Sequence, residues 1–188
     1  MIKKIILDHI ETSNSLLSDT DSVQKLCSIA LSTILSGNKI LLCGNGGSAS
    51  DANHIAAEFV GRFETDRNPL PAISLNDNMS SITAIANDYG FEKIFARQIK
   101  AIGKKDDLLI AISTSGNSQN VINAIKEAQS HKMTCFALTG NDGGGILNLG
   151  CDFIKINSNN TARIQEMHIL IGHIICAHVE SSFNDLSN

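Results

Sequence analysis

The sequence predicts an α/β fold, in which helices flank a doubly wound, mostly parallel sheet of five strands. Short apolar runs alternate with helical patterns along the chain, and this alternation is typical of a parallel sheet covered on both faces. The 188 residues, 43% of them hydrophobic, suffice for one compact domain with its own core. No linker, low-complexity tract or block of charge divides the chain. We therefore expect a single domain over residues 1–188.

Two helices are expected before the first strand. Apolar residues recur at helical spacing over 2–17 and again over 23–34, and the polar stretch 18–21 supplies a new N-cap between them. Gly37-Asn38 ends the second helix. Because these helices carry more apolar surface than one small sheet needs for cover, we expect residues 1–36 to lie in an interface between subunits.

Residues 37–188 are expected to form the α/β core and a terminal helix. Five apolar runs of the kind found in buried parallel strands predict the sheet: 39–43, 72–75, 108–112, 135–138 and 153–156. Helical periodicity predicts the helices: 49–60, 78–102 in two pieces, 119–130, a short one near 143–148, and a long final helix over 162–183. The 78–102 helix is expected to split at Asn87-Asp88-Tyr89-Gly90, which is rich in turn-forming residues.

Composition and charge exclude several classes of protein. Fifteen Lys and Arg against nineteen Asp and Glu give a net charge of −4, and no basic run exceeds a Lys-Lys pair, which argues against a nucleic-acid partner. No apolar run approaches the ~18 residues of a membrane span, and the first is too short for a signal peptide. Five scattered cysteines without a CxxC pair indicate reduced thiols. We expect a cytoplasmic protein that acts on a small molecule.

Three predicted strands run directly into turns rich in glycine and polar residues. The turns are Gly44-Asn45-Gly46-Gly47-Ser48, the segment 113–118, and the segment 139–144. In open α/β sheets, ligands bind in the crevice at the carboxyl ends of the strands. The active site is therefore expected where these turns meet.

The second turn is the candidate phosphate site. It carries four hydroxyl groups, those of Ser113, Thr114, Ser115 and Ser118, at the mouth of a predicted helix. A helix N-terminus offers unpaired N–H groups and a partial positive charge, which suit a phosphate without Lys or Arg. The alternative is an ordinary serine-capped turn, but the density of hydroxyl groups favours the phosphate. The patterns GxxxxGK[ST] and GxGxxG are absent, which excludes a triphosphatase loop.

Two predicted helices carry side chains suited to acid–base or metal chemistry. His54 and Glu58 lie four residues apart, so they would project from one helix face and could share a metal ion or act as an acid–base pair. The alternative is a His–Glu pair that faces solvent. The terminal helix carries Gln165, Glu166 and His173, and spacing alone does not decide whether Gln165 or Glu166 lies on the side of His173.

Taken together, these motifs resemble the phosphoheptose isomerases, the sedoheptulose 7-phosphate isomerase branch of the SIS (sugar isomerase) family. The resemblance extends from about residue 36 to residue 180. The motifs that carry it occur in the family's order: Cys43-Gly44-Asn45-Gly46-Gly47-Ser48, Asp51-Ala52-Asn53-His54-Ile55-Ala56-Ala57-Glu58 with Gly61-Arg62-Phe63, Gly90-Phe91 after Asn87-Asp88, Ile112-Ser113-Thr114-Ser115-Gly116-Asn117-Ser118, and Arg163-Ile164-Gln165-Glu166.

The resemblance implies a SIS-type fold and a set of site residues. His54, Glu58, Gln165 and His173 would surround one divalent metal per subunit, usually zinc, with Glu58 and His173 as the catalytic pair. The implied substrate-binding residues are Asn45, Gly46, Gly47, Ser48, Glu58, Asn87, Asp88, Ser113, Thr114, Ser115, Ser118 and Gln165. Some relatives carry an acidic residue directly before the RIQE sequence, where this chain has Thr161-Ala162, so no role of that carboxylate is transferred.

The implied reaction converts D-sedoheptulose 7-phosphate to D-glycero-D-manno-heptose 7-phosphate through an enediol. It would be the first step of ADP- or GDP-heptose biosynthesis, which supplies lipopolysaccharide or capsule, and the enzyme would be a homotetramer with active sites at subunit interfaces. Two alternatives remain: an isomerase of another phosphosugar, such as an arabinose or hexulose phosphate, and a non-enzymatic SIS protein of the type that binds a replication initiator. The set of His54, Glu58, Gln165 and His173 favours an enzyme, because a binding adaptor needs no such set.

Overall fold

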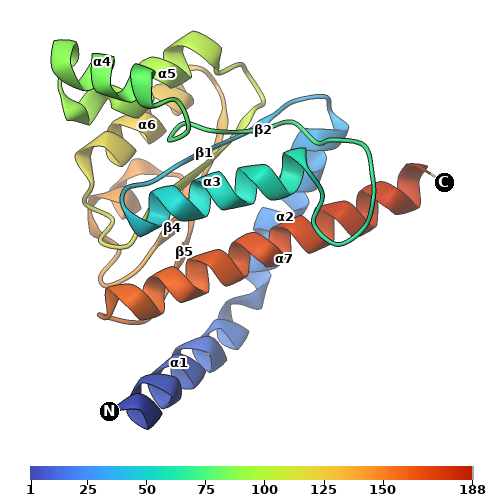
Figure 1. Ribbon diagram of the computed structural model, residues 1–188, viewed down its shortest axis with the longest axis vertical. Coiled ribbons are helices and arrows are strands. Elements are labelled where there is room, and N and C mark those ends of the chain that lie inside the picture. The colour runs from blue at the N-terminus through green and yellow to red at the C-terminus, as the bar shows by residue number, and fades with distance from the viewer. Residues whose placement is uncertain (188) are drawn as a thin grey trace.

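The computed structural model describes residues 1–187 and places helices on both faces of a central parallel sheet (Figure 1). The strands are β1 (Ile40–Cys43), β2 (Ala72–Ser74), β3 (Leu108–Ser113), β4 (Thr134–Thr139) and β5 (Asp152–Lys155). The α-helices are α1 (Ile2–Leu16), α2 (Thr20–Leu35), α3 (Gly47–Val60), α4 (Met79–Tyr89), α5 (Ile94–Ile102), α6 (Gln119–Ser130) and α7 (Thr161–Ser187). Three 3₁₀ segments join them: η1 (Leu17–Asp19), η2 (Phe91–Lys93) and η3 (Gly144–Leu149).

All described strand pairs are parallel, in the order β2-β1-β3-β4-β5. Parallel pairing directs the carboxyl end of every strand to the same edge of the sheet, so the turns that follow β1, β3 and β4 gather there. The predicted α/β class and its five strands are confirmed.

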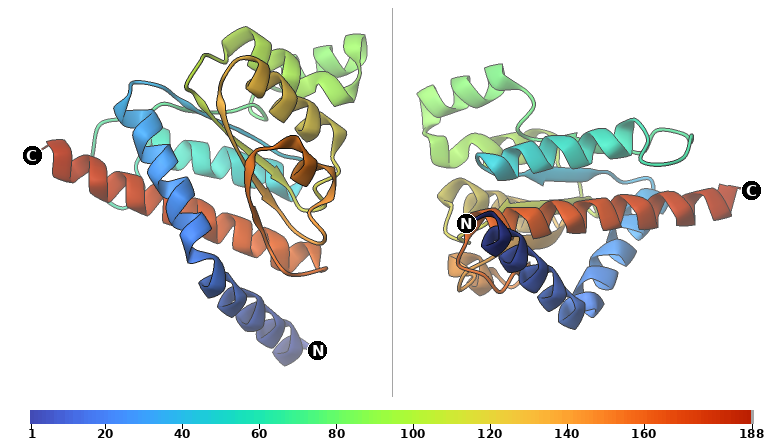
Figure 2. Two further views of the ribbon diagram at one scale, coloured as in Figure 1. Left: turned by 180° about the vertical axis from the view of Figure 1, so that it is seen from behind. Right: turned by 60° about the horizontal axis from the view of Figure 1, so that its bottom comes forward.

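Alternate residues of each strand supply two separate cores. Ile40, Leu42 and Ile110 face a cluster formed with α2, α3 and α7, whereas Leu41 and Leu109 face α5 and α6. Such strands are apolar on both sides, which explains the unbroken apolar runs in the sequence. Figure 2, from behind, shows α2 crossing α7 on the first of these faces.

The predicted split of the 78–102 helix within residues 87–90 is confirmed. Helix α4 ends at Tyr89, and Gly90 terminates it with φ +97°, a conformation that residues with a Cβ rarely adopt. One predicted helix is of a different type. The predicted short helix near 143–148 is the 3₁₀ segment η3, since the three glycines at 143–145 disfavour an α-helix.

One end of the sheet is fastened by a buried carboxylate. Asp107, 1% exposed, lies at the amino end of β3 and accepts hydrogen bonds from the backbone N–H of Lys39 (3.1 Å) and Lys104 (2.8 Å). The ammonium group of Lys39 pairs with the same carboxylate at 2.5 Å. These contacts hold β1 and β3 together at the edge opposite to the turns.

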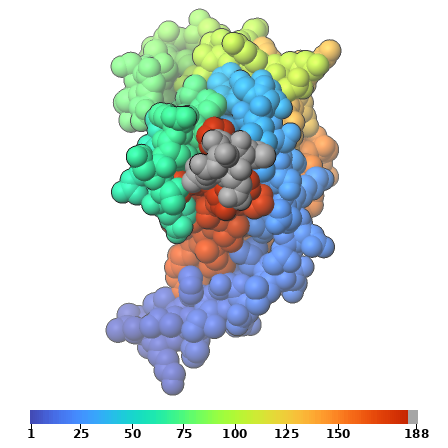
Figure 3. Space-filling model, turned by 90° about the vertical axis from the view of Figure 1, so that its right-hand side faces the viewer, coloured from blue at the N-terminus to red at the C-terminus, as the bar shows by residue number. Residues whose placement is uncertain are grey.

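Helix α1 projects from the body of the chain (Figure 3). It contacts the start of α7, where His9 Nδ1 lies 2.7 Å from Glu166 Oε2 and the Arg163 guanidinium donates to the Ile5 carbonyl at 2.7 Å. Only Thr12 of α1 is buried. Five of its large apolar residues stay exposed, namely Ile2, Ile5, Ile6, Leu7 and Ile10.

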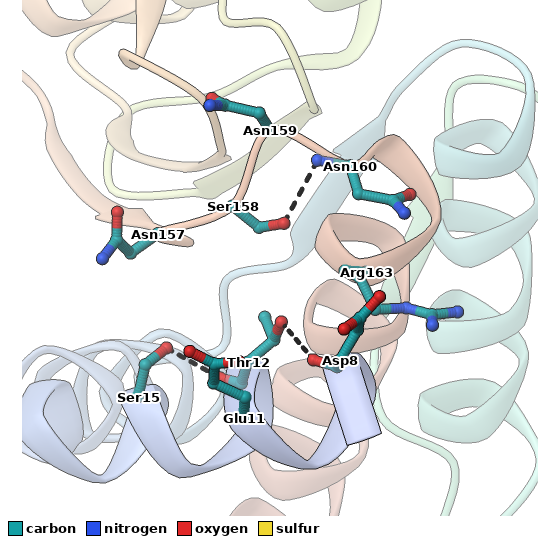
Figure 4. A pocket seen from close by; sticks show the side chains of 9 residues that line it. All are labelled: Asp8, Glu11, Thr12, Ser15, Asn157, Ser158, Asn159, Asn160 and Arg163. Atoms are coloured by element: carbon teal, nitrogen blue, oxygen red, sulfur yellow. Dashed lines mark hydrogen bonds between the residues drawn. The ribbon is translucent and has the colours of Figure 1, made fainter. Parts of the chain in front are cut away.

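A polar cavity of about 530 Å³ lies between α1 and the segment that leads into α7 (Figure 4). Asp8, Glu11 and Thr12 line it from α1, and Asn157 and Asn160 line it from the facing segment. None of the residues predicted for the active site lies in it. No described helix has the length and apolar character that a membrane span requires.

Candidate active site

Helices α3 and α7 run side by side in the same direction and form the framework of the site (Figure 1). Glycines allow their close approach: a Cβ on Gly172 would lie 2.4 Å from Ile55 Cδ1, and one on Gly47 would lie 2.5 Å from Gln165 Nε2. Residues of α3 therefore face residues about 118 positions later in α7. His54 is in this way opposite His173.

Three of the four predicted metal ligands meet between these helices. His54 Nε2 lies 3.1 Å from His173 Nε2, and their rings meet edge to face with centroids 5.3 Å apart. Glu58 Oε1 lies 3.3 Å from His54 Nε2. The His–Glu pair thus faces α7 and His173, not solvent alone.

The donor set fits a divalent metal in type and in part in spacing. Imidazole nitrogens and a carboxylate oxygen are zinc ligands, and two ligands ~2.1 Å from a tetrahedral metal stand ~3.4 Å apart, close to the two distances around His54. Within residues 1–187, however, no three His, Cys, Asp or Glu side chains are arranged so that they could hold a metal ion. Gln165 would have to complete the set.

Gln165 lies nearer the start of the site. Its amide rests against Gly47, seven residues or about two turns before His54 in α3. No described hydrogen bond joins it to His54 or His173. Helix geometry nonetheless separates it from Glu166, which turns to Arg163 and His9. Gln165 therefore faces α3, whereas Glu166 faces α1.

The other conspicuous histidine of the RIQE segment is a core residue. His168 is fully buried and its Nε2 lies 3.1 Å from the carbonyl oxygen of Thr139. Burial lowers the pKa of His168 to about 4, so its ring is neutral at physiological pH. It faces the sheet and takes no part in the site between α3 and α7.

The first glycine-rich turn connects β1 to α3 and is hydrogen-bonded to α6, the helix that follows the 113–118 turn. A Cβ on Gly44 would meet the Ser48 carbonyl oxygen at 2.6 Å, so this position requires glycine. Asn45 exchanges two hydrogen bonds of 2.8 Å with the side chain of Asn120 in α6. This amide pair links the first turn to the helix that the hydroxyl turn precedes. Asn120 carried no distinguishing signal in the sequence.

The hydroxyl turn lies at the carboxyl end of β3 and enters α6. Ser113 Oγ donates to Ser118 Oγ at 3.2 Å, and Ser118 is the N-cap residue of α6. Gly116 has φ +64°, and a Cβ there would lie 1.9 Å from the Gly143 carbonyl oxygen. The turn is therefore packed against the 143–144 turn, while Thr114 and Ser115 remain half-exposed. This arrangement suits a phosphate held by hydroxyls and a helix terminus.

Asn87 and Asp88 lie apart from these groups. They occupy the last turn of α4, exposed, and Asn87 donates to the Asp88 carboxylate at 2.8 Å. No described contact within this single chain connects them to His54 or to the hydroxyl turn.

Comparison with known proteins decides the family. A family model described as the SIS domain matches residues 8–140. A phosphoheptose isomerase from Campylobacter concisus is 46% identical over 97% of both chains. One from Aliarcobacter butzleri is 50% identical over 100% of this chain and 98% of the relative. A solved phosphoheptose isomerase from Francisella tularensis is 36% identical, with a TM-score of 0.93 over 96% of each chain. The chain belongs to the phosphoheptose isomerase family.

Membership of the phosphoheptose isomerases confirms the expected SIS-type fold and the enzymatic interpretation. The relatives are isomerases by name and match over nearly their whole length, so the non-enzymatic adaptor is no longer a competing interpretation. The individual roles of the site residues stay predictions.

A buried carboxylate near the site was not predicted from the sequence. Glu180 in α7 is 3% exposed and accepts hydrogen bonds from the backbone N–H groups of Phe63 (3.0 Å), Glu64 (2.8 Å) and Thr65 (2.7 Å). Its Oε2 also pairs with Arg67 Nε at 3.1 Å. Burial by itself would raise the pKa of Glu180, but the combined effect of these hydrogen bonds is larger and lowers the pKa to about 2. An acidic residue on the apolar side of a helix was the only signal.

The Glu180 carboxylate is expected to couple stability to acid. Because its pKa falls from 4.5 to about 2 on folding, the unfolded chain binds more protons between these values. The contribution is complete above pH 4.5 and is lost as the pH falls towards 2. Urea unfolding across this window should show a shallower pH dependence for Glu180→Gln than for the wild type. The control is Glu127→Gln, on α6; equal slopes for Glu180→Gln and the wild type would contradict the prediction.

Proposed function

We propose that the chain converts D-sedoheptulose 7-phosphate to D-glycero-D-manno-heptose 7-phosphate, the first step of heptose biosynthesis. The observation that carries this proposal is the meeting of His54, Glu58 and His173 between α3 and α7, in a chain of the phosphoheptose isomerase family. The sheet edge nearby carries the turns proposed for the sugar, at Asn45, Gly46, Gly47 and Ser48, and for the phosphate, at Ser113, Thr114, Ser115 and Ser118.

The chemistry requires one base that serves two adjacent carbons. A proton leaves C1 of the ketose and returns at C2 on the same face, so a single carboxylate can carry it. Glu58 would take this role, and its side chain, 22% exposed, is accessible. His173 would exchange the oxygen-bound protons, since an imidazole ring can both donate and accept a proton. Asn87 and Asp88 would contact the sugar from α4.

We propose that His54, Glu58, Gln165 and His173 hold one divalent metal per subunit, expected to be Zn²⁺. When bound, such an ion acts as a Lewis acid towards the substrate carbonyl. Gln165 would supply an amide oxygen from the start of α7, beside the first glycine-rich turn.

Replacing Glu58 tests the base directly. Glu58→Gln is expected to lower kcat about 10²–10⁴-fold, because the amide cannot accept the proton, while substrate binding by calorimetry is largely retained. The matched control is Glu127→Gln, which removes the acid of another His–Glu pair four residues apart: Glu127 in α6 lies 3.1 Å from His131, the residue that caps the helix. Wild-type turnover by Glu58→Gln would remove Glu58 from the mechanism. If the wild type turned over an arabinose phosphate faster than sedoheptulose 7-phosphate, the protein would instead be an isomerase of another phosphosugar.

Removing the metal tests the ligand set. Dialysis against a chelator should abolish turnover of sedoheptulose 7-phosphate, and Zn²⁺ should restore it. Independently of activity, calorimetry on the chelated protein should show one Zn²⁺ per chain, with affinity lowered at least about 10-fold in His54→Gln and unchanged in His131→Gln. Full activity of a protein free of metal by elemental analysis would overturn this proposal.

We further propose a homotetramer in the cytoplasm, with active sites completed between subunits. Its support is the exposed apolar side of α1 and a neighbouring apolar cavity of about 300 Å³, lined among others by Leu16, Leu17, Leu170 and Ile174. An uncovered apolar surface of this kind marks an association site. Light scattering should give four times the 20.1 kDa of one chain, and a double Ile6→Glu, Ile10→Glu variant should give a smaller mass. A monomeric wild type would contradict it.

A further inference from the structure

The last turn of α3 contains Glu58 and ends at Val60. Carbonyl groups in the last turn of a helix have no partner within the helix. Two of them are satisfied by one side chain: the Arg67 guanidinium donates from Nη2 to the Glu58 carbonyl and from Nη1 to the Phe59 carbonyl, both at 2.8 Å. The fork of Arg67 therefore fixes the backbone of the proposed base itself.

Arg67 is held in turn from α7. Its Nε lies 3.1 Å from Glu180 Oε2, and the two side chains are only 3% and 4% exposed. The backbone N–H groups of residues 63–65 also donate hydrogen bonds to Glu180. Burying two charges is costly unless geometry and hydrogen bonds are nearly complete. Here the Glu180 carboxylate binds both the backbone of residues 63–65 and the side chain of Arg67, and so it holds the loop that follows α3.

The same contacts reach the proposed acid. Glu180 lies seven residues, about two helical turns, after His173 in α7. The backbone N–H of Phe63 donates to Glu180. The ring of Phe63 lies against the His173 ring, with the two centroids 5.7 Å apart and the rings tilted by 35°. The buried pair thus connects the end of α3, the 61–67 loop and α7.

We propose that Arg67 and Glu180 are positioning residues for the isomerase reaction, which set Glu58 and His173 relative to each other. This inference rests on the proposed function. It assigns to the pair a role beyond stability: the carboxylate and the imidazole lie on different helices, and the Arg67–Glu180 contact ties the loop between them to both. Displacement of a catalytic group by about 1 Å can cost about 10²-fold in rate.

The test is a split between kcat and KM. Glu180→Gln keeps the shape of the side chain, but its NH₂ group is itself a donor. It must therefore face at least one of the N–H groups that donate to the carboxylate in the wild type, and that hydrogen bond is lost. We expect kcat for sedoheptulose 7-phosphate to fall about 10- to 100-fold, with KM changed less than about 3-fold because the hydroxyl turn is untouched. Arg67→Lys, which keeps the charge but cannot span both carbonyls, should give the same split.

The matched control is Asp107→Asn. Asp107 is also a buried carboxylate: it accepts hydrogen bonds from two backbone N–H groups and pairs with one ammonium group. It lies, however, at the opposite edge of the sheet. We expect Asp107→Asn to lose comparable stability in urea unfolding while its kcat stays within about 2-fold of the wild type. If Glu180→Gln lowers kcat no more than Asp107→Asn does, the pair is merely structural and the proposal is overturned.

A second readout separates this proposal from the proposed function. A wild type that turns over no sedoheptulose 7-phosphate would reject the function, whatever Arg67 does. Hydrogen exchange of the full chain then decides the positioning role: amides of residues 58–67 and of α7 around His173 should exchange faster in Arg67→Lys and not in Asp107→Asn. Unchanged exchange around His173 would overturn the connection between the pair and the site.

Discussion

The site depends on one packing constraint, the parallel contact of α3 with α7. Gly47 and Gly172 leave room for Gln165 and Ile55, so the two helices approach closely and in a fixed register. A change of one residue in that register would turn His54 about 100° away from His173. Helix α3 begins directly after β1, so the sheet fixes its start, and the Arg67–Glu180 pair fixes its end.

The sheet provides the second half of the site without any added charge. A chain with a net charge of −4 has no general attraction for a phosphate. The local geometry replaces it: the hydroxyls of the 113–118 turn, a left-handed glycine and the N-terminus of α6 point at the same edge. The Asn45–Asn120 amide pair joins this turn to the one that precedes α3, so the phosphate end and the reacting end of a sugar would be held by one connected frame.

Two helices of the single chain are poorly covered by the rest of the fold. Asn87 and Asp88 are exposed at the end of α4, a helix without any buried residue, and α1 presents its apolar side to the outside. Both features are natural for elements that are covered in an assembly, since a folded chain gains little by exposing apolar helices to water. The proposed tetramer would account for both at once.

The sequence by itself determined the α/β class, all five strands and the motifs, because period, apolar runs and glycine-rich turns are local properties. It also placed His54 and Glu58 on one helix face. Only the tertiary structure decided that His173 meets them, that Gln165 and not Glu166 turns towards α3, and that His168 belongs to the core. It alone revealed Arg67, Glu180 and Asn120. The physical reason is that the contacts of Asn45 with Asn120, His54 with His173 and Arg67 with Glu180 join residues 75 to 119 positions apart. Such pairings follow from helix register and packing, which no local pattern encodes.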